Sequence, residues 1–194
     1  GAAVTRSRVI GPRVHSDTVC PMDADDGSWA DREDLCGVVA YWPLDGNVKD
    51  VVGGIDGVGT NTSEASGRFA DAGGALEFDG LTSYVDTGFV LSPDSCDSFP
   101  VESWARCIGD GGTILGFEHN SPFGALKSLL EPNTGYGVHL ALHDDSNNKV
   151  LLSDKSAERC NGAWHHLAVT YAEVSKTVTL YVDGMPQLSQ QAAF

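Results

Sequence analysis

The sequence predicts an all-β fold, in which two antiparallel sheets pack face to face as a sandwich. Glycine accounts for 23 of the 194 residues, and Ser, Thr, Asn and Asp are frequent as well. These residues favour turns, so the composition predicts short strands joined by many turns. Hydrophobic residues make up 41% of the chain. This fraction is enough for a packed core, which excludes a disordered or collagen-like chain.

Segments with the pattern of strands follow one another from residue 38 onward, and turn residues separate them at regular intervals. Val178, Leu180 and Val182 alternate with Thr179 and Tyr181, which is the period of a strand with one buried face. The expected strands are Val38 to Leu44, Ala75 to Phe78, Tyr84 to Asp86, Val101 to Cys107, Thr113 to Phe117, Tyr136 to Leu142, Val150 to Ser153, Trp164 to Tyr171, Thr177 to Val182 and a short one at Gln187 to Ala193.

The first 16 residues differ in charge from the rest of the chain. They contain Arg6, Arg8 and Arg13 and no acidic residue, a net charge of +3, whereas the remainder holds 9 basic and 27 acidic residues, hence −18. The overall charge of −15 argues against nucleic acid or an anionic membrane as a partner of the body. Three parts are expected: an N-terminal arm at residues 1–16, an acidic linker at 17–37 and a β-sandwich domain at 38–194.

The arm has the pattern of one isolated strand, which Gly11 and Pro12 then end. A frayed terminus is the alternative interpretation. The expected strand consists of Ala3, Val4, Thr5, Arg6, Ser7, Arg8, Val9 and Ile10.

Five cysteines without any Cys-x-x-Cys pair indicate disulfides rather than a metal site. The sequence does not begin with Met and has no apolar run that could span a bilayer. We therefore expect a processed, extracellular chain, secreted or at the cell surface, without membrane insertion. A Cys20–Cys36 bridge would close the acidic linker, and a Cys107–Cys160 bridge would join two strands. Cys96 would then be unpaired or bonded to another chain.

One N-glycosylation sequon begins at Asn61, in a polar loop. Asn61 is a candidate glycosylation site if the source is eukaryotic. Such tripeptides also occur often by chance, and the sequence does not decide between the two.

Three regions carry a pattern of apolar strands followed by Asp-Gly or Gly-rich turns. They are Val39 to Gly46, Gly73 to Gly80 with Tyr84 to Asp86, and Trp164 to Tyr171 with Val178 to Gly184. In this order they resemble the LamG-like jelly roll of the concanavalin A-like lectin and glucanase superfamily. The resemblance covers about residues 38 to 188 and implies a jelly-roll β-sandwich of two antiparallel sheets.

The resemblance also implies a structural Ca²⁺ near the edge of the sandwich. Asp45, Asp50, Asp79 and Asp86 are the candidate ligands, since hard carboxylate oxygens on tight turns suit Ca²⁺. The alternative is that these aspartates hydrogen-bond to their own backbone in solvated turns. Both interpretations stay open at this stage, and no other cofactor is expected.

For the aromatic residues, the resemblance implies glycan binding. Trp42, Trp104 and Tyr136 are candidate residues for stacking on a sugar, although each could instead belong to the core. The glucanases of the superfamily carry two glutamates that bracket an aspartate at alternating positions of one strand. Glu102 is isolated on its expected strand, so we expect no enzymatic activity.

The family's jelly roll normally continues beyond the Val178 to Gly184 region by two further elements, and only ten residues follow here. We therefore expect a sandwich that is incomplete at its C-terminus and exposes unpaired strand edges. The arm is a spare strand of opposite charge, which predicts that it fills this gap, in its own chain or in a neighbour.

Three hypotheses follow from this. In the first, the chain is an extracellular structural subunit that polymerises with copies of itself by donating its N-terminal strand. In the second, it is a secreted, Ca²⁺-dependent glycan-binding module. In the third, it is a fragment of a larger adhesin.

Overall fold

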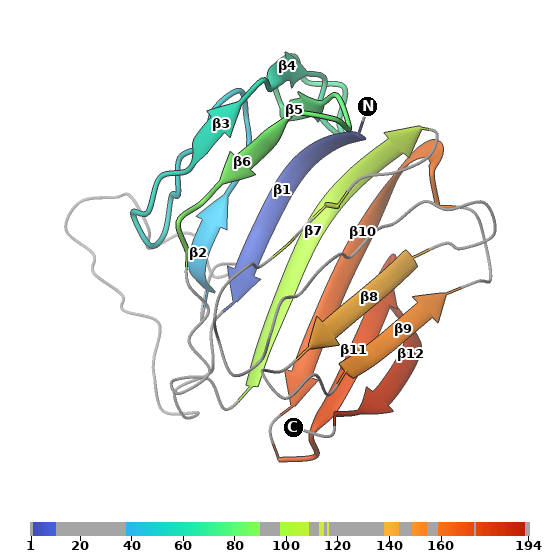
Figure 1. Cartoon of the computed structure of the whole chain (residues 1–194). Helices are drawn as coiled ribbons and strands as arrows, with labels where there is room; N and C mark the ends of the chain where they lie inside the picture. Colours follow the sequence, from blue (N-terminus) through green and yellow to red (C-terminus); the bar gives the residue numbers. More distant parts are fainter. Residues whose placement is uncertain are drawn as a thin grey trace.

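The computed structural model describes residues 2–10, 38–89, 98–108, 113–114, 116, 138–143, 149–154, 159–172 and 174–192 (Figure 1). All regular structure in these residues is β, and every strand pair is antiparallel. This confirms the predicted all-β class. The described part of the chain contains no helix with the length and hydrophobicity of a membrane span.

Twelve strands occupy the described residues. Their bounds are β1 (Ala2–Ile10), β2 (Val38–Trp42), β3 (Val58–Thr60), β4 (Ser63–Ala65), β5 (Ala75–Phe78), β6 (Tyr84–Asp86), β7 (Ser98–Ile108), β8 (Val138–His143), β9 (Lys149–Asp154), β10 (Asn161–Ala172), β11 (Thr177–Val182) and β12 (Met185–Gln191).

Eight of these strands form one large sheet. Its order is β12-β11-β10-β7-β1-β5-β4, and β2 also pairs with β1. β3 pairs with β6, and β8 pairs with β9, in two further two-stranded sheets. In Figure 1, the β8–β9 hairpin lies across the β10 to β12 part of the large sheet. The large sheet and this hairpin form the two layers of a sandwich.

The core lies between these layers. On β10, Leu167, Val169 and Tyr171 are buried and alternate with partly exposed residues, as the sequence pattern predicts. They pack in one cluster with buried residues of the other layer and of neighbouring strands. The cluster includes Ala40, Trp42, Leu44, Leu76, Val101, Ala105, Val138, Leu140, Val150, Leu152, Val178, Leu180 and Val182. Burial of these side chains from both layers is the main source of stability for the fold.

Two details of the strand prediction are wrong. Residues 113, 114 and 116, the described part of the segment expected at Thr113 to Phe117, are not in a strand. Ile114 instead packs against the core from an irregular segment. Its side chain is apolar because it is partly buried there, although its backbone is not in a strand. The three-residue strands β3 and β4 were not predicted, because they are mostly exposed and lack an alternating pattern.

The predicted N-terminal strand is confirmed as β1. It lies in the interior of the large sheet, between β7 on one side and β2 and β5 on the other. Figure 1 shows β1 running along β7, with β2 and β5 on its other side. In this single chain, therefore, the arm belongs to the same sheet as the rest of the domain.

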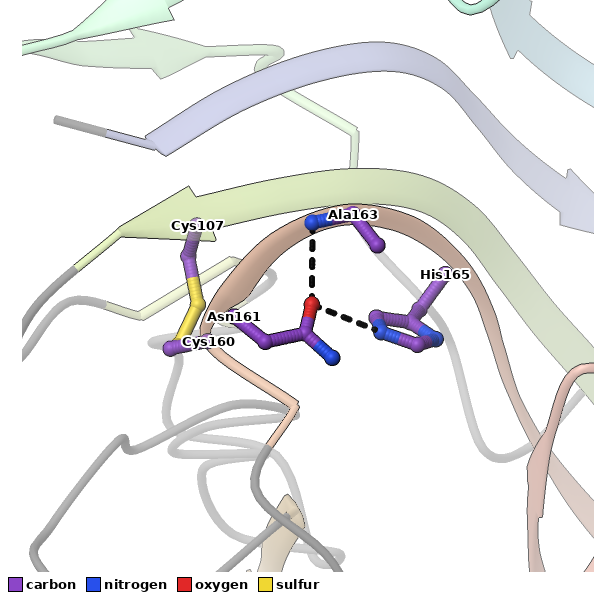
Figure 2. Close-up of a disulfide and its surroundings, with 5 residues drawn as sticks. All are labelled: Cys107, Cys160, Asn161, Ala163 and His165. Atoms are coloured by element: carbon purple, nitrogen blue, oxygen red, sulfur yellow. Dashed lines mark hydrogen bonds between the residues drawn. A yellow bond between two sulfur atoms is a disulfide. The ribbon is translucent and has the colours of Figure 1, made fainter.

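The predicted disulfide between Cys107 and Cys160 is confirmed (Figure 2). Cys107 is near the end of β7, and Cys160 immediately precedes β10, so the bond joins two adjacent strands at one end of the sheet. Cys20, Cys36 and Cys96 lie outside the described residues.

Candidate functional site

The position that β1 occupies is the first candidate site. Ser7 is opposite Trp42 of β2 and Ser103 of β7, and Val9 is opposite Ala40 and Val101 of the same two strands. Closer to the start of β1, Val4 is opposite Leu76 of β5 and Ala105 of β7. Without β1, the inner edges of β7, β2 and β5 would lose their ladder partners.

The walls of this position are well packed. Ala40 and Val101 are fully buried, Ser103 is 1% exposed, and Leu76 and Ala105 are almost as deeply buried. They belong to strands that are far apart in sequence, so the gap that β1 fills is built by the folded domain as a whole. In this structure, the gap holds one extended strand, β1, between strands of the same domain.

A cleft of about 410 Å³ lies on the outward face of the sheet beside β1 and is the second candidate site. Its walls come from β7, β10, the β11–β12 turn and the loop between β4 and β5. The lining residues are Arg68, Glu102, Ser103, Trp104, His166, Asp183 and Gly184. Trp104 and Glu102 point outward because Val101, Ser103 and Ala105 alternate with them and face the core.

Arg68 stacks on the aromatic ring of Trp104. Its guanidinium carbon lies 3.8 Å from the Trp104 ring centroid and 4.3 Å from the centroid of Phe69. Both distances are well within the range of cation–π contacts. The cleft therefore combines a positive charge with a flat aromatic surface.

Glu102 and His166 occupy neighbouring strands and line the cleft side by side. The His166 Nε2 lies 3.2 Å from the Glu102 Oε2, and the His166 and Trp104 rings have centroids 5.2 Å apart. Glu102 is directly opposite Ala168 and His166 is opposite Trp104, so the strand pairing brings the three side chains together.

Asp183 is at the tight turn between β11 and β12. Its Oδ2 lies 2.9 Å from His165 Nδ1, and its Oδ1 accepts a hydrogen bond of 3.0 Å from the His166 backbone N–H. Partial burial alone would raise the pKa of Asp183. The hydrogen bonds and the nearby charges of His165 and Arg159 outweigh this effect, so the pKa is lowered. Asp183 thus ties the turn to β10 as a carboxylate.

The candidate calcium ligands mostly serve as turn residues. Asp50 is buried, and its carboxylate accepts backbone hydrogen bonds from Tyr41, Val52, Gly53 and Ile55. A carboxylate that is used in this way has little capacity left for a cation.

Asp79 has a similar role. It accepts backbone hydrogen bonds from Leu81, Thr82 and Ser83, and these bonds lower its pKa. Asp86 accepts one from Gly88, and the Asp45 carbonyl accepts one from a side chain two residues later. Within the described ranges, no three His, Cys, Asp or Glu residues are grouped as metal ligands. These residues therefore do not fit a calcium site as arranged, and calcium binding stays a prediction.

The three candidate sugar-stacking residues have different positions. Trp42 is only 2% exposed, packs edge-on against Phe89 in the core and donates its Nε1–H to the Ile55 carbonyl. For Trp42 the structure favours the alternative of a core residue, because its strand turns this ring into the sandwich. Trp104 lies in the cleft, as a stacking residue requires. Tyr136 is outside the described residues.

Asn61 is exposed in the turn between β3 and β4, at a positive φ of 51°. Its side-chain Nδ2 donates a hydrogen bond to the Thr82 Oγ1. Its exposure is compatible with a glycan, and the glycosylation of Asn61 stays a prediction.

Sequence reasoning missed most residues of the cleft. Arg68 is in a loop with no motif, and nothing in the sequence places it near Trp104. The pairing of Glu102 with His166 depends on the register between β7 and β10, which are 64 residues apart at this point. Only the Asp183-Gly184 turn carries a signal of its own, because Asp-Gly favours a two-residue hairpin turn. Both residues have positive φ, 51° and 77°.

The comparisons agree with this architecture. A family model described as the concanavalin A-like lectin/glucanases superfamily matches residues 78–193, which is more than half of the chain. The chain belongs to this superfamily. The resemblance expected from the sequence is therefore confirmed. No match was found among curated proteins or among solved structures.

The matched range has a consequence for the two sites. It begins at the end of β5 and includes β6 to β12, so it contains the β7, β10 and β11–β12 parts of the cleft. β1 to β4 precede it.

Laminin G-like and concanavalin A-like domains are generally binding domains without catalytic activity. On β7, Glu102 is followed at alternate positions by Trp104 and Arg106, which is not the three-acid pattern of the glucanases.

Proposed function

We propose that this protein is an extracellular structural subunit of a filament, in which β1 of each chain occupies the sheet of its neighbour. The observation that carries the proposal is the interior position of β1, between β7 and the pair β2 and β5. A neighbour's β1 would make the same antiparallel ladder as the chain's own. Such a contact is head-to-tail and need not close, so repetition produces a filament.

The ladder supplies a large part of the binding energy. A nine-residue strand that pairs on both sides forms on the order of a dozen backbone hydrogen bonds, each with a net contribution of about 1 kcal/mol. The charges are also favourable, because the +3 of residues 1–16 meets a body of −18. The opposite charges would steer the arm toward a neighbour as well as toward its own sheet.

The segment between β1 and β2 is long enough for exchange. Residues 11–37 have a contour length of about 90 Å when extended, whereas a folded chain of this size has a radius of gyration of about 16 Å. Even with the predicted Cys20–Cys36 bridge, residues 11–19 alone reach about 30 Å. Length therefore permits either the chain's own sheet or that of an adjacent molecule.

The Cys107–Cys160 disulfide supports the extracellular part of the proposal. Disulfides persist mainly in oxidising compartments outside the cytosol.

Deletion of residues 1–12 tests this function. We expect the truncated chain to lose its assemblies in sedimentation velocity and to unfold at a lower temperature. A peptide of residues 1–12 should bind in the vacated position and restore thermal stability, and a scrambled peptide of the same composition should not. Assemblies that persist unchanged after the deletion would refute the proposal.

A second candidate function is glycan binding in the cleft, which the partly buried Trp104 ring in its lining favours. A sugar that stacks on Trp104 would have to displace the Arg68 guanidinium or use the remaining open edge of the ring. A glycan array with the wild-type chain and Trp104→Ala tests it. Binding that is lost in the variant supports this function, and loss with a chelator would add calcium to it.

A further inference from the structure

The contact between Arg68 and Trp104 crosses the strand β1. Arg68 is in the loop between β4 and β5, and Trp104 is on β7. In the sheet, β1 separates β5 from β7. A side-chain contact between the two sides therefore has to pass over the outward face of the β1 backbone. The register agrees, since Trp104 is opposite Arg6, just beyond the stretch of β1 that pairs with β5.

The Arg68–Trp104 contact obstructs one route by which β1 could leave the sheet. Within the plane of the sheet, β1 is held between β7 and the strands β2 and β5. On the inward face, the buried residues Val101 and Ala105 of β7 and Ala40 of β2 pack in the core. A strand that leaves sideways must therefore lift through the outward face, which the Arg68–Trp104 contact crosses next to Arg6.

Both ends of the contact are held in place. The loop of Arg68 is tight: the Gly67 N–H donates to the Asp71 carbonyl over 2.9 Å, and the Ala70 N–H donates to the Gly67 carbonyl over 3.1 Å. A side chain at Gly67 or Gly74 would collide with the Asp71 carboxylate, so only glycine fits at these two positions of the loop. On β7, the ring of Trp104 is flanked by His166.

We propose that the Arg68–Trp104 stack is a clasp that holds the docked β1 in the sheet and slows its departure. For movement of the strand between chains, this inference rests on the proposed function. The clasp itself acts on whichever copy of β1 occupies the position. Its strength is that of a partly exposed cation–π contact, which corresponds to an effect of about threefold to tenfold on strand opening.

Hydrogen exchange of the full chain, followed by mass spectrometry, tests the clasp. In Arg68→Ala, amides of β1 should exchange about threefold to tenfold faster than in the wild type, with no change in β11 and β12. Thr179→Ala is the control. The Thr179 Oγ1 lies 2.8 Å from the Ser189 Oγ, an exposed contact that joins β11 to β12, and neither strand pairs with β1. The control should leave the exchange of β1 unchanged.

The outcomes separate a clasp from general stabilisation. Equal acceleration across all strands, or equal effects of Arg68→Ala and Thr179→Ala on β1, would overturn the proposal, as would unchanged exchange in Arg68→Ala. If Arg68→Ala does not fold, Arg68→Lys keeps the charge but loses the planar stack and should accelerate β1 exchange about twofold. The experiment measures the opening of β1 regardless of which chain supplies the strand. The test of the Arg68–Trp104 contact therefore remains valid even if strand donation between chains is disproved.

Discussion

β1 and β10 both lie in the interior of the large sheet, on either side of β7, but the chain holds them in different ways. β10 continues through a short turn into β11, and the Cys107–Cys160 bond fixes its start to β7. β1 is separated from β2 by residues 11–37. An interior position in a sheet therefore does not by itself fix which molecule supplies the strand. β10 is tied to its own chain by the turn and the disulfide, whereas we propose that β1 can come from a neighbouring chain.

The largest expected effect concerns the core of β10. Leu167 is fully buried, so Leu167→Ala should destabilise the chain by about 2–5 kcal/mol, which urea unfolding measures. The comparison of the two strands adds a second expectation. The peptide of residues 1–12 should restore the thermal stability of the truncated chain but not that of Leu167→Ala, because the defect of this variant is in β10. If the peptide also restored the stability of Leu167→Ala, the proposed difference between β1 and β10 would be wrong.

The covalent attachment of β10 should have the next largest effect. Cys107 and Cys160 are 53 residues apart, and the double variant Cys107→Ala, Cys160→Ala should lose about 2–4 kcal/mol in the same assay. Assembly should persist at temperatures where the variant is folded, since the bond does not involve β1. Loss of assembly from a folded double variant would show that the two strands are coupled.

The smallest effect concerns Asp183, which ties the β11–β12 turn to β10. Its folded pKa lies below its unfolded value, so its contribution is present above about pH 4 and is lost as the pH falls through the folded pKa. The carboxylate is 44% exposed, so solvent screening limits this contribution to about 1 kcal/mol or less. As the pH is lowered from 7 to 2, the unfolding temperature should fall less steeply in Asp183→Asn than in the wild type. Parallel curves would contradict this role.

The sequence predicted the elements with strong local patterns. β1, β5, β6 and β11 were found from alternation and turn residues, and the Cys107–Cys160 bridge followed from the position of each cysteine next to an expected strand. The superfamily was recognised from three regions in order, and the family model matches residues 78–193, which include the late strands.

The rest depends on contacts between distant segments. The position of β1 between β7 and β5 cannot be read from its own residues, because its two faces resemble those of any short strand. The clasp likewise joins a loop without a motif to one of four tryptophans. For Trp42 the sequence left a stacking role and a core position open, because it does not show which of two alternate faces is inward, and in the fold Trp42 lies in the core.

The central claim is that β1 of one chain docks in the sheet of another, and cross-linking between two single-cysteine variants tests it most directly. Ser7 and Ser103 are directly opposite in the ladder, a spacing at which cysteines can form a disulfide. Chains with Ser7→Cys are mixed with chains with Ser103→Cys before assembly and then oxidised, and each variant alone serves as the control for the native cysteines.

Strand donation predicts disulfide-linked dimers in the mixture, above the level of either control, on a non-reducing gel. A chain that carries both substitutions should then form linked ladders of many subunits. The contrary result is equally clear: no linked dimers in the mixture, together with a double variant that forms its bond only within the monomer, would show that β1 stays in its own chain.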